Sequence, residues 1–530
     1  MIQHDPVQFW AAAQPDRVAL RSDHSAWTYA QLDRAIWATA DALYGRGLGA
    51  GEHLALEFAP EDGIHFAVTL HALHRIGLLP VLVGTTATPE ERQALRERAQ
   101  VDFTLSADDL VLEPPTDAPP PKPKRETKRR GARGVAEAFV AGATGGAVGA
   151  RAGLGDPAGE PAPLLDKDGE PILTRRLDAP AAIAFTSGTS GAPRAVALTH
   201  GNLLWSAIGS ARNLGVRAGD VWLCPMPLHH VGGLSIVTRA ASYGTTALLH
   251  ERFDADRVNE AIDRDGVTLL SLVPTMLARL LEARGGRPFP PPLRAALIGG
   301  GPIPAALLEE AAALGLRALP TYGLTEAASQ VTTLPLSEWP RGLATAGRPL
   351  PFTRVEIRRE DGRLAVRGEE GEIVVRGPTV MAGYLGDPEA TVEALEGRWL
   401  RTGDVGAWDD EGRLLVLDRR VDRIVTGGEN VSPQEVERVL LAHPAVRGAC
   451  VVALPSSEWG QEVAAAVEWK PGAAATLEEL RAHAAATLSG FKLPRRLMAV
   501  SALPRTASGK LLRRVVRERF LDEVAKQKHP

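Results

Sequence analysis

The sequence contains few cysteines and no long apolar run. Only two cysteines, Cys224 and Cys450, occur in 530 residues, which excludes a disulfide framework and a cysteine-based metal site. No stretch of about eighteen uninterrupted apolar residues is present, so no membrane span is expected. The N-terminus lacks a basic start followed by an apolar core, so no signal peptide is expected either.

A strong excess of charge of one sign is also absent. The formal net charge is −4, whereas a dedicated nucleic-acid binder carries a marked basic patch or stripe. Hydrophobic residues make up 45% and charged residues 23% of the chain, as in ordinary globular proteins. We therefore expect a cytoplasmic enzyme without a nucleic-acid partner. Its length favours roughly three or four domains.

The first 112 residues alternate between helical and strand-like patterns. Leu32, Ile36, Ala40 and Leu43 recur at helical spacing, which predicts a helix. Short apolar runs suited to strands are typical of a layered α/β architecture. These runs occupy residues 53–58 and 77–83.

Residues 113–175 differ in composition from the rest of the chain. The segment is rich in proline and basic residues and continues into alanine- and glycine-rich sequence. Such a segment can bury little apolar surface, so we expect a flexible insertion. Its positive cluster is either a solvated linker or a contact for an acidic partner.

The α/β character returns after the insertion and changes near residue 418. We expect strands at 221–228, 245–250, 294–301, 371–377 and 412–418, and helices around 259–262 and 275–281. A smaller unit follows, with expected helices at 433–441 and 477–488 and strands at 448–454 and 462–469. We therefore divide the chain into domains 1–417 and 418–530.

A loop of small residues is the strongest local signal. Residues 186–196 read TSGTSGAPRAV and follow an apolar run at 181–185 that predicts a buried strand. Small side chains let backbone N–H groups approach an anion, and hydroxyls add donors. The spacing is not that of a Walker P-loop. Taken alone, the loop is either a phosphate cradle or a flexible surface loop. Its candidate residues are Thr186, Ser187, Gly188, Thr189, Ser190, Gly191 and Arg194.

Two further segments place glycines beside candidate ligand groups. His230 precedes two glycines and can line a substrate channel, although a single histidine is more often structural. Gly299, Gly300 and Gly301 follow an expected strand and suit a closely packed aromatic or nucleotide ligand.

Residues 321–330, TYGLTEAASQ, offer groups for a nucleotide and its metal. The candidates here are Tyr322, Gly323, Thr325 and Glu326. Thr325 supplies a hydroxyl for a phosphate. Glu326 supplies a hard oxygen for Mg²⁺, which takes one or two carboxylates together with phosphate oxygens. A helix-capping pattern explains the same residues equally well if the segment stands alone.

Three segments near the expected domain boundary and the C-terminus complete the set. Asp404 in RTGDVG can accept hydrogen bonds from ribose hydroxyls, although TGD is also a common turn. Arg419 can bind phosphate or ribose, in a stretch that is otherwise a hinge or a charged linker. Lys510 in LPRTASGKLLRR is suited to phosphate oxygens and a departing pyrophosphate, or belongs to a basic helix.

Taken together and in this order, the motifs resemble the adenylate-forming superfamily of acyl-CoA synthetases, adenylation domains and luciferases. The resemblance covers nearly the whole chain except residues 113–175. It implies an α/β fold with a large N-terminal domain of several subdomains with mixed sheets and a small mobile α+β C-terminal domain. It also implies ATP, Mg²⁺ and coenzyme A as cofactors and a small-molecule carboxylate as substrate.

The resemblance also implies roles for individual residues. Hydroxyls of the loop at 186–191 and of Thr325 contact phosphates, and Glu326 holds the metal ion. Asp404 and Arg419 bind the ribose and phosphate region. Lys510 serves adenylation, and Gly427, Gly428 and Glu429 lie near the face used in thioester formation.

Two positions depart from the family pattern. The loop usually ends in Pro-Lys-Gly, but here it reads Pro193-Arg194-Ala195. Arginine keeps the positive charge, so we expect a functional loop with less flexibility. The position two residues after Arg419 is often acidic or polar at the hinge, and here it is Val421.

Within the superfamily, several stretches are most similar to the o-succinylbenzoate–CoA ligases of menaquinone biosynthesis. These stretches are 226–236, 271–281, 297–304, 321–331 and 343–350. Small residues around the expected acyl pocket leave room for an aromatic ring, and Ser329, Gln330 or His230 can face a second carboxylate.

Three other functions stay open at this point. The chain can be a general aryl- or fatty-acyl-CoA synthetase. It can also be an adenylation module that loads a carrier protein, although no carrier-like domain follows Lys510. The third is a catalytically silent ATP-binding protein that uses the basic insertion, which the presence of Glu326, Asp404 and Lys510 disfavours.

Overall fold

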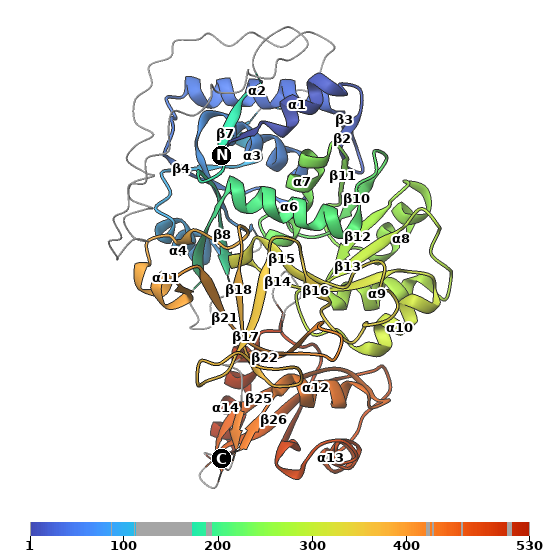
Figure 1. Cartoon of the computed structure of the whole chain (residues 1–530). Coiled ribbons are helices and arrows are strands. Elements are labelled where there is room, and N and C mark those ends of the chain that lie inside the picture. The colour runs from blue at the N-terminus through green and yellow to red at the C-terminus, as the bar shows by residue number, and fades with distance from the viewer. Residues whose placement is uncertain are drawn as a thin grey trace.

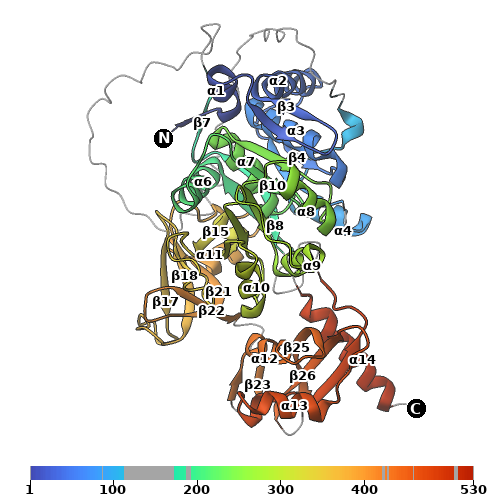
Figure 2. The same cartoon turned by 90° about the vertical axis from the view of Figure 1, so that its right-hand side faces the viewer.

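The computed structural model describes residues 2–85, 87–110, 112, 172–186, 193–419, 424–426, 429–456, 459–505 and 511–528. The described residues up to Arg419 form a large body, and the described residues from Ile424 onward form a smaller one below it in Figures 1 and 2. The predicted fold class, a large N-terminal and a small C-terminal α/β unit, is confirmed.

A six-stranded sheet of order β19–β9–β8–β5–β4–β6 flanks the glycine-rich loop. Its strands β6, β4, β5 and β8 are parallel, whereas β9 pairs antiparallel with both β8 and β19. The parallel strands are apolar because helices cover both faces of such a sheet. The six strands are β4 (His53–Leu56), β5 (Leu79–Leu82), β6 (Phe103–Leu105), β8 (Pro180–Thr186), β9 (Arg194–Thr199) and β19 (Gly383–Tyr384).

A nine-stranded sheet of order β16–β15–β14–β13–β12–β10–β11–β2–β3 forms the second layer. Its central strands, from β2 to β14, are parallel, and both edges end in antiparallel strands. The strands are β2 (Val18–Arg21), β3 (Ala26–Thr28), β10 (Val221–Cys224), β11 (Thr246–Leu249), β12 (Leu269–Leu272), β13 (Ala295–Ile298), β14 (Ala318–Leu324), β15 (Ser329–Thr333) and β16 (Arg348–Pro349).

Two apolar helices, α3 (Gly63–Ile76) and α7 (Val231–Tyr243), link the cores of the two sheets. Each contributes buried side chains to both hydrophobic clusters, as expected of a helix that is apolar on most of its circumference. The remaining helices of the large body are α1 (Pro6–Ala13), α2 (Tyr29–Gly45), α4 (Pro89–Arg98), α6 (His200–Leu214), α8 (Ala255–Arg264), α9 (Pro274–Arg284), α10 (Ala305–Ala313) and α11 (Pro388–Ala394).

A third, antiparallel sheet completes the large body. Its order is β17–β18–β21–β20, with β22 paired to β21. The strands are β17 (Arg354–Arg358), β18 (Gly371–Arg376), β20 (Leu395–Glu396), β21 (Trp399–Trp408) and β22 (Leu414–Arg419). Because β22 runs to Arg419, the proposed domain boundary at 417–418 falls inside a strand.

The small body is a sheet with helices packed on it. Alternate residues of β25 belong to two hydrophobic clusters, so both faces of this sheet are covered. Its strands, β24–β23–β26–β25 with β27 beside β26, are β23 (Ile424–Thr426), β24 (Glu429–Val431), β25 (Val446–Ser456), β26 (Gly460–Trp469) and β27 (Arg496–Val500). The helices are α12 (Pro433–Leu441), α13 (Leu477–Ala485) and α14 (Arg513–Lys528).

Most predicted elements occur where periodicity placed them. The helix expected at 433–441 is α12, and the strands expected at 448–454 and 462–469 are β25 and β26. One stretch behaves differently: Thr174 and Arg175, which we grouped with the insertion, belong to β7 (Thr174–Arg176), which pairs with β1 (Ile2–His4). An ion pair helps to hold β7 beside β1, because the Arg175 guanidinium pairs with the buried carboxylate of Asp5.

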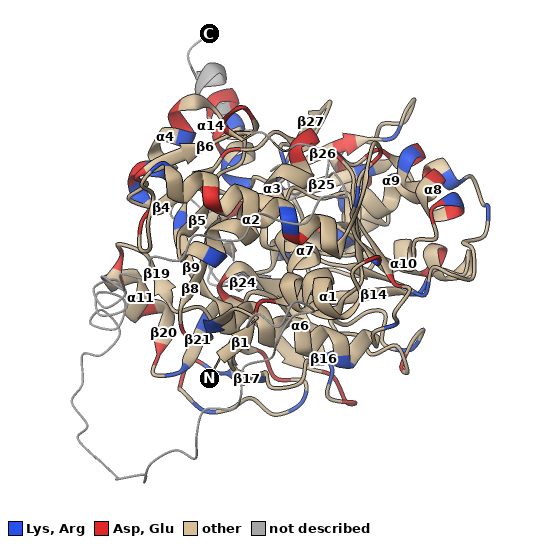
Figure 3. Cartoon of the chain, turned by 90° about the horizontal axis from the view of Figure 1, so that it is seen from above, with Lys and Arg blue, Asp and Glu red and all other residues tan. Residues whose placement is uncertain are grey.

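None of the described helices has the length and apolar character that a bilayer crossing requires. Basic and acidic residues alternate along the surface helices and loops, as Figure 3 shows for α8 and α4. The described surface therefore agrees with the small net charge of the sequence.

Candidate active site

A cavity of about 560 Å³ lies at the carboxyl ends of the parallel strands β12 and β13 and beside β14. This edge is where open α/β sheets bind ligands, because loops after the strands supply the contacts. The cavity brings together most of the predicted site residues that the structure describes. They are Thr186, Arg194, His230, Gly299, Gly300, Gly323, Thr325 and Glu326.

Several predicted residues lie elsewhere or outside the described parts. Gly301 does not line the cavity, and a Cβ added to it would meet no other atom within 4 Å. Only the backbone is described for Arg419 and Glu429, which belong to β22 and β24. Ser187, Gly188, Thr189, Ser190, Gly191, Val421, Gly427, Gly428 and Lys510 lie outside the described residues.

The hairpin between β14 and β15 requires glycine at position 323. A Cβ there would lie 1.8 Å from the carbonyl oxygen of Ser329, a distance that no side chain tolerates. The short helix η3 (Thr325–Ala327) follows, and Ala328 and Ser329 then adopt positive φ angles of 51° and 97°. Strained non-glycine residues of this kind gather at functional sites. The turn thus presents Thr325 and Glu326 to the cavity.

Glu326 belongs to a short chain of interacting side chains. The hydroxyl of Tyr384 donates to Glu326 Oε1 at 3.0 Å. The guanidinium of Arg194 lies over the ring of Tyr384, 5.1 Å from its centroid. Burial and the neighbouring Glu326 carboxylate raise the pKa of Tyr384, so its hydroxyl stays protonated and acts as a donor.

A second tyrosine–carboxylate pair lies beside the cavity. The Tyr322 hydroxyl donates to Asp404 Oδ2 at 2.7 Å, and the Asp404 backbone N–H donates to Thr402 Oγ1. Asp404 lies in β21 rather than in a free turn, and it is 6% exposed. The two predicted nucleotide ligands, which are distant in sequence, are thus neighbours.

The rings of His230 and His229 are in contact, with centroids 4.3 Å apart and planes tilted by 49°. Burial lowers the pKa of His230, and burial together with His230 lowers the pKa of His229 to about 3. Both imidazoles are therefore neutral near pH 7. His230 lines the 560 Å³ cavity, where a neutral ring acts as a polar wall rather than as a cation.

Sequence reasoning missed Arg239, which also lines this cavity. It lies on α7, is 2% exposed and donates to Ser206 Oγ at 3.0 Å. Its guanidinium lies over the ring of Trp222, 5.6 Å from the centroid. Within the described parts of the chain, no carboxylate pairs with it, and its buried Nε has no hydrogen-bond partner. Burial lowers the pKa of Arg239, and the neighbouring Tyr243 offsets this effect only in part.

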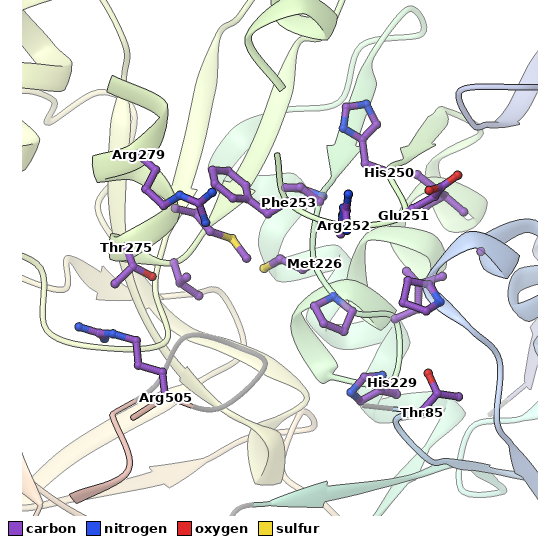
Figure 4. A pocket seen from close by; sticks show the side chains of 18 of the residues that line it. Thr85, Met226, His229, His250, Glu251, Arg252, Phe253, Thr275, Arg279 and Arg505 are labelled. Atoms are coloured by element: carbon purple, nitrogen blue, oxygen red, sulfur yellow. The ribbon is translucent and has the colours of Figure 1, made fainter. Parts of the chain in front are cut away.

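A larger cavity of about 900 Å³ adjoins the first. Met226, Pro227, Val273 and Met276 line both. Its outer part lies between the two bodies of the chain, where Figure 4 shows Arg505 of the small body facing Thr275 and Arg279 of α9. Basic side chains outnumber acidic ones in its wall; the basic set is Arg252, Arg279, Arg447, Lys470 and Arg505.

The described residues fit a magnesium ion only if phosphate supplies further ligands. They contain no group of three or more histidine, cysteine or acidic side chains that can hold a metal. Of the three carboxylates that line the cavity, Glu326 lies beside the hydroxyl-bearing Thr325, whereas Glu372 is paired with Arg401 and Glu393 belongs to α11. Mg²⁺ bound through one or two carboxylates plus phosphate oxygens needs no more than this.

Comparison with known proteins identifies the family of the chain. The family described as AMP-binding enzyme matches residues 7–385, and the AMP-binding enzyme C-terminal domain matches residues 435–510. A 2-succinylbenzoate–CoA ligase of Geobacillus sp. (strain WCH70) is 36% identical over 504 residues, with 95% of each chain covered.

Solved structures of an o-succinylbenzoate CoA synthetase from Bacillus subtilis are similar over almost the whole chain. The complex with its acyl-adenylate intermediate has a TM-score of 0.81 at 32% identity, covering 98% of each chain. The complex with ATP and a magnesium ion has the same TM-score and identity, covering 97% of this chain and 99% of that one.

Proposed function

Because the chain belongs to the AMP-binding enzyme family, we propose that it is an ATP-dependent acid–CoA ligase acting on 2-succinylbenzoate. In the first half-reaction, a substrate carboxylate attacks the α-phosphorus of ATP, and pyrophosphate leaves as the acyl-adenylate forms. In the second, the CoA thiol loses its proton and attacks the acyl carbonyl, AMP leaves, and the thioester forms. The product is a precursor of the kind that menaquinone biosynthesis uses.

Arg239 is our main reason for proposing a substrate with two carboxylates. A buried guanidinium without a described carboxylate partner is costly, and a ligand carboxylate compensates it through paired hydrogen bonds. The substrate 2-succinylbenzoate has two carboxylates, of which one is activated and one remains ionised. Arg239 is placed to receive the ionised one, because it lines the cavity that also contains the nucleotide residues. A fatty acid or plain benzoate leaves this cation unpaired.

The residues around the cavity position ATP rather than take part in bond-making. Tyr322 and Asp404 form a hydrogen-bonded pair that suits the adenosine end. Thr186, Arg194 and Thr325 suit the phosphates, and Glu326 would hold Mg²⁺. When bound, the ion neutralises charge on the phosphates. This arrangement supports our assignment because phosphoryl chemistry depends mainly on positioning and charge stabilisation. Lys510, by family resemblance, serves the departing pyrophosphate.

The larger cavity suits CoA. It shares walls with the first cavity, so a thiol that enters along it reaches the acyl group. Its outer end between the two bodies is basic, which favours the phosphates of CoA. We assign thioester formation to a rotated position of the small domain, with Gly427, Gly428 and Glu429 near its working face. The requirement for both ATP and CoA is our reason for placing the reaction in the cytoplasm.

A pyrophosphate-release assay with CoA and a panel of acids tests the proposal. We expect 2-succinylbenzoate to give the highest kcat/KM, ahead of benzoates and medium-chain fatty acids. Equal or better turnover with those acids would contradict the substrate assignment. Activity that requires a carrier protein instead of free CoA would identify an adenylation module. No pyrophosphate release with any acid would leave an ATP-binding protein without ligase activity.

A further inference from the structure

Arg194, Tyr384 and Glu326 connect the base of the glycine-rich loop to the carboxylate assigned to Mg²⁺. They come from three separate elements, β9, β19 and η3. The Arg194 guanidinium rests on the Tyr384 ring, and the hydroxyl of the same ring donates to Glu326 Oε1 at 3.0 Å. A single side chain thus contacts a phosphate-directed cation through its face and a metal-directed carboxylate through its edge.

The strand pairing explains why these residues meet. In the β8–β9 pair, Arg194 lies opposite Thr186, so it is the first paired residue after the loop. Tyr384 of β19 lies opposite Val196 of β9. Arg194 and Val196 share a face of the strand, which makes Arg194 the diagonal neighbour of Tyr384. The Met381 N–H donates to the Glu326 carbonyl at 2.8 Å and ties η3 to the segment before β19.

The chemistry of the three groups suits a positioning role. A carboxylate that binds a metal through one oxygen is commonly oriented by a hydrogen bond from an outer partner, whose loss weakens metal binding. The Tyr384 hydroxyl is such a donor. An aromatic face also holds a cation by attraction to the ring electrons, and a planar guanidinium stacks on it better than an ammonium group does.

We propose that Tyr384 is a positioning residue for magnesium–ATP: its hydroxyl orients Glu326, and its ring keeps Arg194 aligned at the base of the loop. This accounts for arginine at a position where the family usually has lysine. The inference rests on the proposed ATP-dependent adenylation, but it is independent of which acid is activated.

Metal binding tests the hydroxyl. The probe is Mn²⁺, titrated into the full-length protein saturated with α,β-methylene-ATP, which cannot release pyrophosphate. Bound Mn²⁺ is counted by electron paramagnetic resonance. We expect Tyr384→Phe to raise the Mn²⁺ dissociation constant about tenfold or more. Tyr29→Phe is the matched control, because the buried Tyr29 hydroxyl bonds to the Ala240 and Thr245 carbonyls outside the site. It should leave the constant unchanged.

A cycle with Glu326→Gln separates positioning from packing. If Tyr384 acts through Glu326, adding Tyr384→Phe to Glu326→Gln weakens Mn²⁺ binding no further. An effect of Tyr384→Phe that persists undiminished in the Glu326→Gln background would overturn the role, as would an unchanged constant in the single variant. Wild-type protein that binds neither nucleotide nor Mn²⁺ would instead count against the proposed function.

Nucleotide binding without metal tests the ring. We expect Arg194→Lys to weaken binding of α,β-methylene-ATP roughly twofold to thirtyfold, the range of a cation–π contact. In a Tyr384→Leu background the same change should have little effect, since the aromatic face is gone. Equal losses in both backgrounds would show that Arg194 acts without Tyr384 and would overturn this half of the proposal.

Discussion

Two buried arginines of the large body differ in what surrounds them. Arg294 precedes β13 and forms two hydrogen bonds with the carboxylate of Asp220, from Nε at 2.9 Å and Nη2 at 2.6 Å. Its guanidinium also donates to the carbonyls of Leu214 and Gly215. Arg239 on α7 has a serine hydroxyl and an aromatic face. Both are almost fully buried, at 7% and 2% exposure.

From this difference we infer that Arg294 has a structural role and that Arg239 binds a ligand. Burial alone would raise the pKa of Asp220, but the hydrogen bonds from Arg294 and its other partners lower it overall. Both side chains are therefore ionised, and each compensates the charge of the other. Arg239 has no such compensation within the described residues, and it faces a cavity instead of a carboxylate. A buried charge that the protein leaves uncompensated is a candidate binding group.

Removing Arg294 should have the largest effect on stability. In Arg294→Met, the ionised Asp220 stays buried without its cation, and the Leu214 and Gly215 carbonyls lose a donor. We expect a loss of about 3–5 kcal/mol. Calorimetric unfolding of the full chain measures it. An unchanged unfolding temperature would show that Arg294 is no more structural than Arg239.

Acid extends the comparison to buried histidines, which stay neutral in the folded protein while the unfolded chain takes up protons. Burial, with a further contribution from Arg175, lowers the pKa of His71 and of His200 to about 3, against 6.5 when exposed. The unfolded chain therefore takes up protons first, and stability falls as the pH drops from 6.5 towards 3. Each histidine should cost about 1.4 kcal/mol per pH unit in that window.

The unfolding temperature as a function of pH tests this effect. His71→Asn should flatten the fall between pH 6.5 and 4.5, even if the variant is less stable at every pH. Identical slopes in wild type and His71→Asn would contradict the lowered pKa of His71.

Arg239→Met should have the smallest effect on stability, which is the matched contrast to Arg294→Met. The variant loses the hydrogen bond to Ser206 and the contact with Trp222, but it also removes an uncompensated buried charge. We expect a change of less than about 1 kcal/mol, towards higher stability. A loss as large as that of Arg294→Met would mean that Arg239 is part of the framework.

The sequence predicted the site motifs because their residue types are unusual. A run of Thr, Ser and Gly after an apolar strand, and a Thr-Glu pair after Tyr-Gly, stand out without any structure. Their meeting in one cavity followed from the family resemblance, and the structure places Thr186, Glu326 and Gly299 around the same space. Periodicity was sufficient for elements such as α2 and α12.

Arg239 and Tyr384 could not be predicted in this way. Arg239 in IVTRAAS and Arg294 in LRAALI both lie beside apolar residues. The local sequence does not indicate which of the two has a carboxylate nearby in the fold. That distinction depends on Asp220, which is 74 residues before Arg294. Tyr384 meets Glu326 across 58 residues through the pairing of β19 with β9, an edge contact that no local pattern specifies.

The claim that Arg239 is reserved for a substrate carboxylate is tested most directly by exchanging charge on both sides of the contact. The kcat/KM for pyrophosphate release is measured for wild type and Arg239→Met, each with 2-succinylbenzoate and with its analogue whose non-activated carboxylate is a primary amide. Wild type should prefer the dicarboxylate by about 30-fold or more, and the preference should vanish in Arg239→Met. A preference that survives the substitution, or that wild type never had, would contradict the account.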